Sequence, residues 1–282
     1  MRKRNSFISV LTMFLAIGFV IIFSRPVKAT ANGVILKANR TYAAYDVTGD
    51  GVKDKIRIRT ANQIDDETYT SLTVSVNGKT AYRLKNTRFY NVIANIYTLK
   101  NGQPFLYLYA PADNGDGPVC ALLKYTNGKF RKALDFTEIM AGYGNHRIGE
   151  VTNLNGNKIV ITESIVSYSL GINAINFTYK YVNGKFVPTS RYGSYKEIYS
   201  ADGSSRYFTV NSDLPVYTRP GATAVNTTLK TGSLTKIIKC ALINGKMYIQ
   251  LECDGEIYWI KALKNPPISD NERQFMEVRY AG

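Results

Sequence analysis

The chain contains few of the residues and motifs that common enzyme active sites use. His146 is the only histidine, and only three of the 282 residues are cysteine. A single imidazole excludes zinc sites built from several histidines and leaves one candidate base for a catalytic triad. The G-x-S-x-G, H-E-x-x-H and glycine-rich phosphate-binding motifs are also missing. Carboxylate pairs that cleave glycosides come together only in space, so the sequence leaves them open and predicts no catalytic residue.

The odd number of cysteines argues against a disulfide framework. Cys240 and Cys253 lie on a predicted hairpin about Asn244-Gly245, which separates them by about 13 Å, beyond the reach of a disulfide. Cys120 alternates with apolar residues in VCALLKY, which favours a packed thiol over a nucleophile paired with His146. We therefore expect three buried free thiols.

Only one apolar run approaches the length of a membrane span. It extends over Phe7–Phe23, follows three basic residues, and precedes a Ser-Arg-Pro break and small residues at Ala29 and Ala31. This order is typical of a secretory signal, so residues 1–31 are predicted to be removed on export. The alternative is a retained membrane anchor that faces outward. The predicted location is secreted or cell-wall associated, with membrane contact only if the signal stays on.

Acidic residues are in the minority. Asp and Glu number 21 against 36 Lys and Arg, a formal net charge of +15. Residues 1–31 hold five basic residues and no acid, which leaves +10 on the remainder. Such a charge favours contact with anionic polymers or surfaces. There is no block of basic residues and no nucleic-acid-binding motif, so nucleic acid is not a predicted partner.

From Asn32 onward, apolar and polar residues alternate with period two, which is typical of β-strands. Asn-Gly pairs separate the runs, and both residues accept the positive φ of tight hairpin turns. Asn-Gly-Lys turns begin at Asn77, Asn127 and Asn183, each in the second hairpin of a unit of about four strands. Residues 32–203 are therefore predicted to be an all-β domain of antiparallel, propeller-blade-like repeats. A partial propeller, a stack of antiparallel sheets and a twisted sandwich all remain open.

The most distinctive motif is the acidic loop YDVTGDGVKDKIRI, residues 45–58. Calcium takes six to eight oxygen ligands, and a loop that presents oxygens from alternate residues can supply them. Three carboxylates within one short loop would repel each other without a cation. We expect one structural calcium ion, and the alternative is an Asp-rich turn without an ion. The predicted ligands are Asp46, Thr48, Asp50, the carbonyl of Val52, and Asp54.

The loop is neither an EF-hand nor a dockerin. Position 12 would have to be acidic but is Arg57, and KIRIRT alternates as a strand where a helix would be needed. The D-x-T-x-D-G-x-x-D spacing before a strand resembles the calcium loops of the FG-GAP/VCBS repeat family. That resemblance implies β-propeller blades and an extracellular structural or adhesive role. The corresponding turns NLNGNK and LKNGQP lack the acids, so one ion is expected.

A second module is predicted at residues 204–264, after a polar segment. The stretch LPVYTRPG (Leu214–Gly221), Gly232 before a strand, and the closing GEIYWIK resemble a bacterial SH3-like domain. Tyr258 stands where the family has its second glycine. The resemblance implies a small barrel that binds cell-wall peptidoglycan or proline-containing peptides without catalysis.

Three residues of this module are predicted to bind the ligand. Tyr217, Arg219 and Trp259 would line the groove, because aromatic rings stack on sugar or peptide faces. The alternative is that Trp259 is a core aromatic of the small barrel. In residues 265–282, Ser269 and Glu272 form a capping-box pattern, which predicts a short C-terminal helix.

Together, these patterns predict a non-enzymatic, secreted or cell-surface binding protein of a Gram-positive type cell. Calcium would stabilise the repeats, and the SH3-like module would bind a cell-wall polymer or a surface protein. The alternative is a secreted enzyme that acts on cell-wall glycan through a site assembled from scattered acids.

Overall fold

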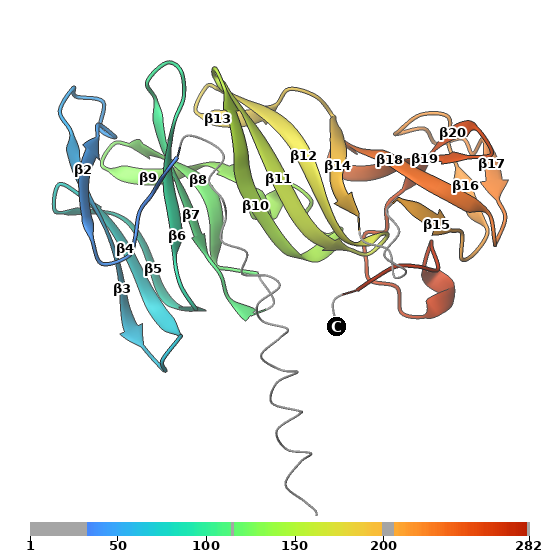
Figure 1. Cartoon of the computed structure of the whole chain (residues 1–282), viewed down its shortest axis with the longest axis horizontal. Coiled ribbons are helices and arrows are strands. Elements are labelled where there is room, and N and C mark those ends of the chain that lie inside the picture. Colours follow the sequence, from blue (N-terminus) through green and yellow to red (C-terminus); the bar gives the residue numbers. More distant parts are fainter. Residues whose placement is uncertain (1–32, 114–115, 199–205, 281–282) are drawn as a thin grey trace, which may run out of the picture.

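Figure 1 shows a computed structural model that describes residues 33–113, 116–198 and 206–280. The predicted secretion signal lies outside the described residues. Strands, tight turns and short 3-10 segments make up the described chain, with no α-helix among them. The strands form antiparallel sheets, so the prediction of an all-β protein is confirmed.

The first sheet is a four-stranded meander. Its strands are β2 (Thr41–Tyr45), β3 (Asp54–Gln63), β4 (Tyr69–Val76) and β5 (Lys79–Phe89). In β3, Ile56 and Ile58 are buried while Arg57 and Arg59 are exposed. One face of this sheet therefore packs on the core and the other faces solvent.

The second sheet has both faces covered. In spatial order its strands are β1 (Val34–Ile35), β6 (Ile93–Thr98), β7 (Pro104–Ala110), β8 (Val119–Thr126) and β9 (Lys129–Asp135). Leu106 and Leu108 of β7 pack in one apolar cluster with the first sheet, whereas Tyr107 and Tyr109 pack in another with the third. The near-continuous apolar sequence FLYLYA follows from this position between two layers.

The third sheet has nine strands and extends to the C-terminal part of the chain. They are β10 (Gly144–Asn155), β11 (Lys158–Ser167), β12 (Gly171–Val182), β13 (Lys185–Pro188), β14 (Tyr192–Ile198), β15 (Tyr207–Thr209), β18 (Leu234–Ile243), β19 (Lys246–Cys253) and β20 (Glu256–Lys261). β13 and β14 both pair with β12, and β14 pairs with β18. A separate pair consists of β16 (Leu214–Val216) and β17 (Thr227–Leu229).

The three predicted repeat units each fold as an antiparallel meander of four strands, β2–β5, β6–β9 and β10–β13. Asn77, Asn127 and Asn183 have φ of 50°, 50° and 48°, and each precedes a glycine of positive φ. This is the geometry of a two-residue hairpin turn. The three sheets lie side by side in Figure 1, and two apolar clusters join them face to face. Of the arrangements left open above, the described sheets form a stack.

The C-terminal region differs from two finer predictions, and the first is the small barrel. None of the sheets formed by the described residues closes into a barrel. β18 pairs with β14 and β15 along one edge, so β15 and β18–β20 extend the third sheet, while β16 and β17 pair separately. Phe208 and Ile249 belong to the same apolar cluster as Ile161 of the repeat region. A shared sheet and a shared core therefore join the two predicted modules.

The predicted C-terminal helix is a single 3-10 turn, Asp270–Glu272. Ser269 makes no capping hydrogen bond, and the Glu272 carboxylate accepts from the backbone N–H of Ile268. Beyond this turn the chain is irregular, with bends on either side of Phe275, which is fully buried in the core and bridges Val210 of the chain after β15. Burial of this large ring on a non-helical segment outweighs the weak local preference for a helix.

Candidate functional site

In the acidic loop, Asp54 is a buried carboxylate with internal partners. It is 1% exposed. It accepts hydrogen bonds from the backbone N–H groups of Val47 and Thr48, at 2.7 and 2.9 Å. The side-chain amide of Asn77 donates a third bond at 2.6 Å. Asp54 therefore ties the β2–β3 turn to the β4–β5 turn of the first sheet.

Asp46 closes the loop from the other end. Its carboxylate accepts from the N–H groups of Gly49 and Gly51, at 2.6 and 2.7 Å, and more weakly from Asp50. Desolvation raises the pKa of Asp46, but these bonds, together with one from the Thr48 hydroxyl, lower it below its ordinary value. The loop is thus organised around an ionised carboxylate.

The predicted calcium ligands are only partly brought together. The Thr48 hydroxyl lies 3.2 Å from Asp46 Oδ1 and 3.3 Å from Asp54 Oδ1, so these two carboxylates flank it. Asp50 accepts from the N–H of Val52, whose side chain is exposed. Within the described ranges, no group of three or more His, Cys, Asp or Glu side chains has the spacing of a metal site. The donor chemistry suits calcium, and binding stays a prediction that is tested below.

The predicted ligand-binding rings of the C-terminal module are buried. Tyr217 and Trp259 are 7% and 4% exposed. They exchange two backbone hydrogen bonds, of 2.8 and 2.9 Å, and pack in a small cluster with Tyr248. Arg219 is exposed. The burial of Trp259 fits the alternative interpretation, in which this ring is a core aromatic.

A basic aromatic surface lies beside Trp259. The ring of Tyr192, which is 40% exposed, has its centroid 5.9 Å from that of Trp259. The Lys239 ammonium lies 4.6 Å from the Tyr192 centroid, the Arg191 guanidinium 5.6 Å from it, and the Lys261 ammonium 4.7 Å from that of Tyr217. We call this surface the basic aromatic patch: Arg191, Tyr192, Tyr217, Lys239, Trp259 and Lys261.

Strand register explains why the patch forms. Ser194, Lys239, Gln250 and Trp259 are cross-strand partners on β14, β18, β19 and β20. Tyr192 lies two residues before Ser194, and Lys261 lies two residues after Trp259. Because side chains two residues apart on a strand point to the same face, both lie on the face that carries Lys239 and Trp259. The alternate residues of these strands, such as Ile249, face the core. The patch is thus on the outer face of the third sheet.

The cations of the patch keep their charge available. None of the ion pairs between described residues includes Arg191, Lys239 or Lys261. Sequence reasoning missed the patch because Tyr192 and Lys239 are far apart in the chain. They meet only through the pairing of β14 with β18, which no local motif signals.

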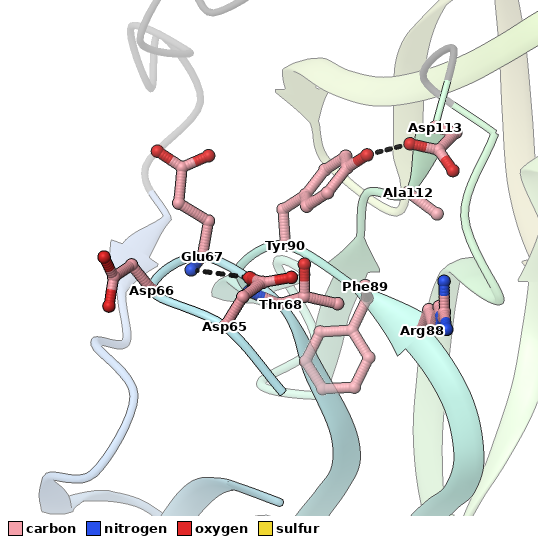
Figure 2. Close-up of a pocket in the computed structure, with 9 residues that line it drawn as sticks. All are labelled: Asp65, Asp66, Glu67, Thr68, Arg88, Phe89, Tyr90, Ala112 and Asp113. Atoms are coloured by element: carbon pink, nitrogen blue, oxygen red, sulfur yellow. Dashed lines mark hydrogen bonds between the residues drawn. The ribbon is translucent and has the colours of Figure 1, made fainter. Parts of the chain in front are cut away.

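Figure 2 shows an acidic hollow of about 610 Å³ at one end of the first sheet. Asp65, Asp66 and Glu67 come from the β3–β4 loop, and the Tyr90 hydroxyl donates to Asp113 on the opposite side. A hydrogen bond from the backbone of Glu67, together with bonds from the side chain and backbone of Thr68, holds the pKa of Asp65 below its ordinary value. The carboxylates of Asp66 and Glu67 point in different directions, so the acids do not converge on one point.

Glu163 is a buried acid that the sequence analysis did not single out. Its side chain is fully buried, and neither carboxyl oxygen has a hydrogen-bond partner among the described residues. Burial raises its pKa well above the ordinary value, Arg147 opposes this rise, and Asp135 adds to it. Glu163 lines neither of the two hollows described here. Period two places it on the same strand face as Ile161, a signal by which it could have been found.

The expectation of buried free thiols is confirmed for all three cysteines. Cys120 donates a hydrogen bond to the carbonyl of Gly149 at 3.4 Å. Burial, with the nearby charge of Glu163, raises the pKa of Cys120 to about 12. The thiol therefore stays protonated near neutral pH, as expected for a packed cysteine.

No protein-family model matches this chain, and the comparisons with curated proteins and with solved structures found no match. No described segment forms a helix with the length and apolar character needed to cross a bilayer.

Proposed function

We propose that this protein is a secreted or cell-surface, non-enzymatic binding protein that holds an anionic cell-wall polymer on the basic aromatic patch. The observation that carries this proposal is the position of Lys239 and Arg191 over the Tyr192 ring, with no carboxylate of the described residues paired to either cation. The ring fixes the cations in place, and their unneutralised charge attracts polyanions. The excess of basic residues supports the same class of partner.

The motif resemblances support an extracellular role. We interpret the three stacked meanders as blade-like repeats of the FG-GAP/VCBS kind, and residues 204–264 as an SH3-like module fused to the third sheet. In this proposal the binding surface is centred on Tyr192, and the buried rings of Tyr217 and Trp259 support it from below. The secretory segment at residues 1–31 would deliver the protein to the wall.

Neutralising two lysines of the patch is expected to weaken wall binding. In Lys239→Gln/Lys261→Gln, two charges that face the polymer are lost, each worth up to about 1 kcal/mol at an exposed site, so retention on purified wall sacculi should fall roughly tenfold. The measurement is the bound fraction against sacculus concentration at two salt concentrations. Because added salt screens the charges, it should weaken the original protein more than the variant.

The matched control is Lys79→Gln/Lys85→Gln, which removes the same charge from two exposed positions on strand β5 of the first sheet. Equal retention of the two double variants would contradict the role of the patch. Release of soluble fragments from labelled wall by the purified protein would contradict the non-enzymatic part of the proposal and favour the glycan-acting enzyme.

We further infer that the acidic loop holds one structural calcium ion. Added calcium should then raise the melting temperature, by the equivalent of about 2.7 kcal/mol at a hundredfold excess over the dissociation constant. Asp50→Asn should abolish this rise without lowering the melting temperature in chelator, because the Asp50 carboxylate accepts one local bond, from Val52, among the described residues. Identical melting temperatures in calcium and in chelator would remove calcium from the proposal.

A further inference from the structure

A shallow groove of about 340 Å³ lies on the outer face of the third sheet, next to the basic aromatic patch. It forms because β13 and β14 share the same edge of β12. β13 pairs with residues 179–182 and β14 with residues 173–176. The chain between them crosses this edge at Thr189, whose N–H donates to the Thr178 carbonyl at 2.8 Å. The change of partner strand leaves the groove open to solvent.

The groove is lined by small polar groups with free hydrogen-bonding capacity. The hydroxyls of Thr178 and Ser194 have no partner within the described part of the chain. The carbonyl oxygen of the Asn176 amide accepts from the Thr162 hydroxyl at 2.7 Å, which leaves its two N–H donors available. Hydroxyl and amide groups that can both donate and accept match the vicinal hydroxyls of a sugar ring.

One end of the groove carries an aromatic ring and a cation. Both Tyr192 and Lys239 line it, and both also belong to the patch. The Tyr192 ring is the large exposed apolar surface at this end. A sugar ring in the groove would pack its C–H face against Tyr192, with its hydroxyls on Thr178 and Ser194. An anionic group on the next unit would then lie at Lys239.

Groove and patch form one continuous track across the strands. Asn176 is the cross-strand partner of Ser194, and the row continues through Lys239 to Trp259. Four inter-strand steps give a length of about 19 Å. We propose that the groove binds one hydroxyl-rich sugar unit of an anionic glycan whose chain runs across β12, β14 and β18 toward Trp259. This inference rests on the proposed function, since the patch supplies the neighbouring anion contact.

Two oligosaccharide probes of equal length test the groove, a neutral amino-sugar oligosaccharide and one that carries carboxylates. Trp259, the only tryptophan, reports binding by its fluorescence because it lies beside Tyr192. Thr178→Val/Ser194→Ala removes two hydroxyls at little change of size and should weaken binding of both probes at least fivefold. Lys261→Gln should weaken binding of the anionic probe alone. The control Thr73→Val/Ser71→Ala makes the same changes on β4.

The outcomes separate the groove from the proposed function. If the groove variant binds both probes as the original protein does, the groove proposal is overturned. If the original protein binds neither probe yet is retained on sacculi through Lys239 and Lys261, the groove proposal also fails while the proposed function stands. If the original protein is not retained on sacculi at all, the proposed function itself fails.

Discussion

Replacing Glu163 with glutamine is expected to raise the free energy of unfolding by about 2 kcal/mol near pH 8, because the amide stays neutral, whereas the buried carboxyl costs stability at a pH where the unfolded chain ionises it. The side chain lies within the third sheet, on the face that packs against the second. Neither of its oxygens accepts a hydrogen bond from the described chain. Arg147 lowers the cost of the ionised form, but burial is the larger effect.

The free energy of unfolding should also depend on pH in a way that identifies the Glu163 carboxyl. Burial raises the pKa of Glu163 in the folded protein well above 4.5, its ordinary value, which the unfolded chain keeps. The folded protein therefore binds this proton more tightly, so the stabilising contribution is complete below pH 4.5 and is lost as the pH rises through the folded pKa. In Glu163→Gln this decline should disappear.

Urea unfolding between about pH 4 and pH 9 measures both effects. The control Glu256→Gln changes an exposed glutamate at the start of β20 and should leave the pH profile of stability unchanged. Parallel profiles for the original protein and Glu163→Gln would mean that the buried carboxyl has a partner, such as Arg147 through an internal water, and would contradict the prediction.

The hairpins were predictable because their signals are local. Asn77-Gly78 and Asn127-Gly128 adopt the positive φ that these residues accept, and the alternating runs on either side become strands. What the sequence left open was the packing of one meander on the next. That packing shows in the strand β7, which is apolar on both faces because layers lie on both sides of it.

The failures were at places where tertiary contacts outweigh local patterns. The capping-box residues predicted a helix, but Phe275 is buried in the core and Met276 donates its N–H to the Thr209 carbonyl, so the segment is not helical. In the same way, the pairing of β14 with β18 replaced the predicted barrel and created the basic aromatic patch. The acidic loop was found from sequence because its residues are consecutive, whereas the patch and Glu163 depend on strand pairing and sheet packing.

Adding a methyl group at Gly149 is expected to destabilise the protein by about 3 kcal/mol, because it overpacks the contact between the second and third sheets. A Cβ at this position would lie 1.9 Å from Cδ1 of Phe136 and 2.5 Å from Oε2 of Glu163. The backbone has little freedom to move away, since the Gly149 carbonyl accepts from the Tyr107 hydroxyl at 2.8 Å and from the Cys120 thiol. Denaturant unfolding of Gly149→Ala measures the loss.

A second substitution identifies the cause of that loss. Phe136→Leu removes the ring that the new methyl group meets, so the double variant should be more stable than the sum of the two single effects predicts, with a coupling of about 1 kcal/mol or more. If hydrogen bonds within each sheet alone set the spacing of the second and third sheets, Gly149→Ala would lower the free energy of unfolding only slightly. The effects of the two substitutions would then be additive. A large single effect with partial rescue would instead show that the close approach at Gly149 sets the spacing of the two sheets, and with it the depth at which Glu163 is buried.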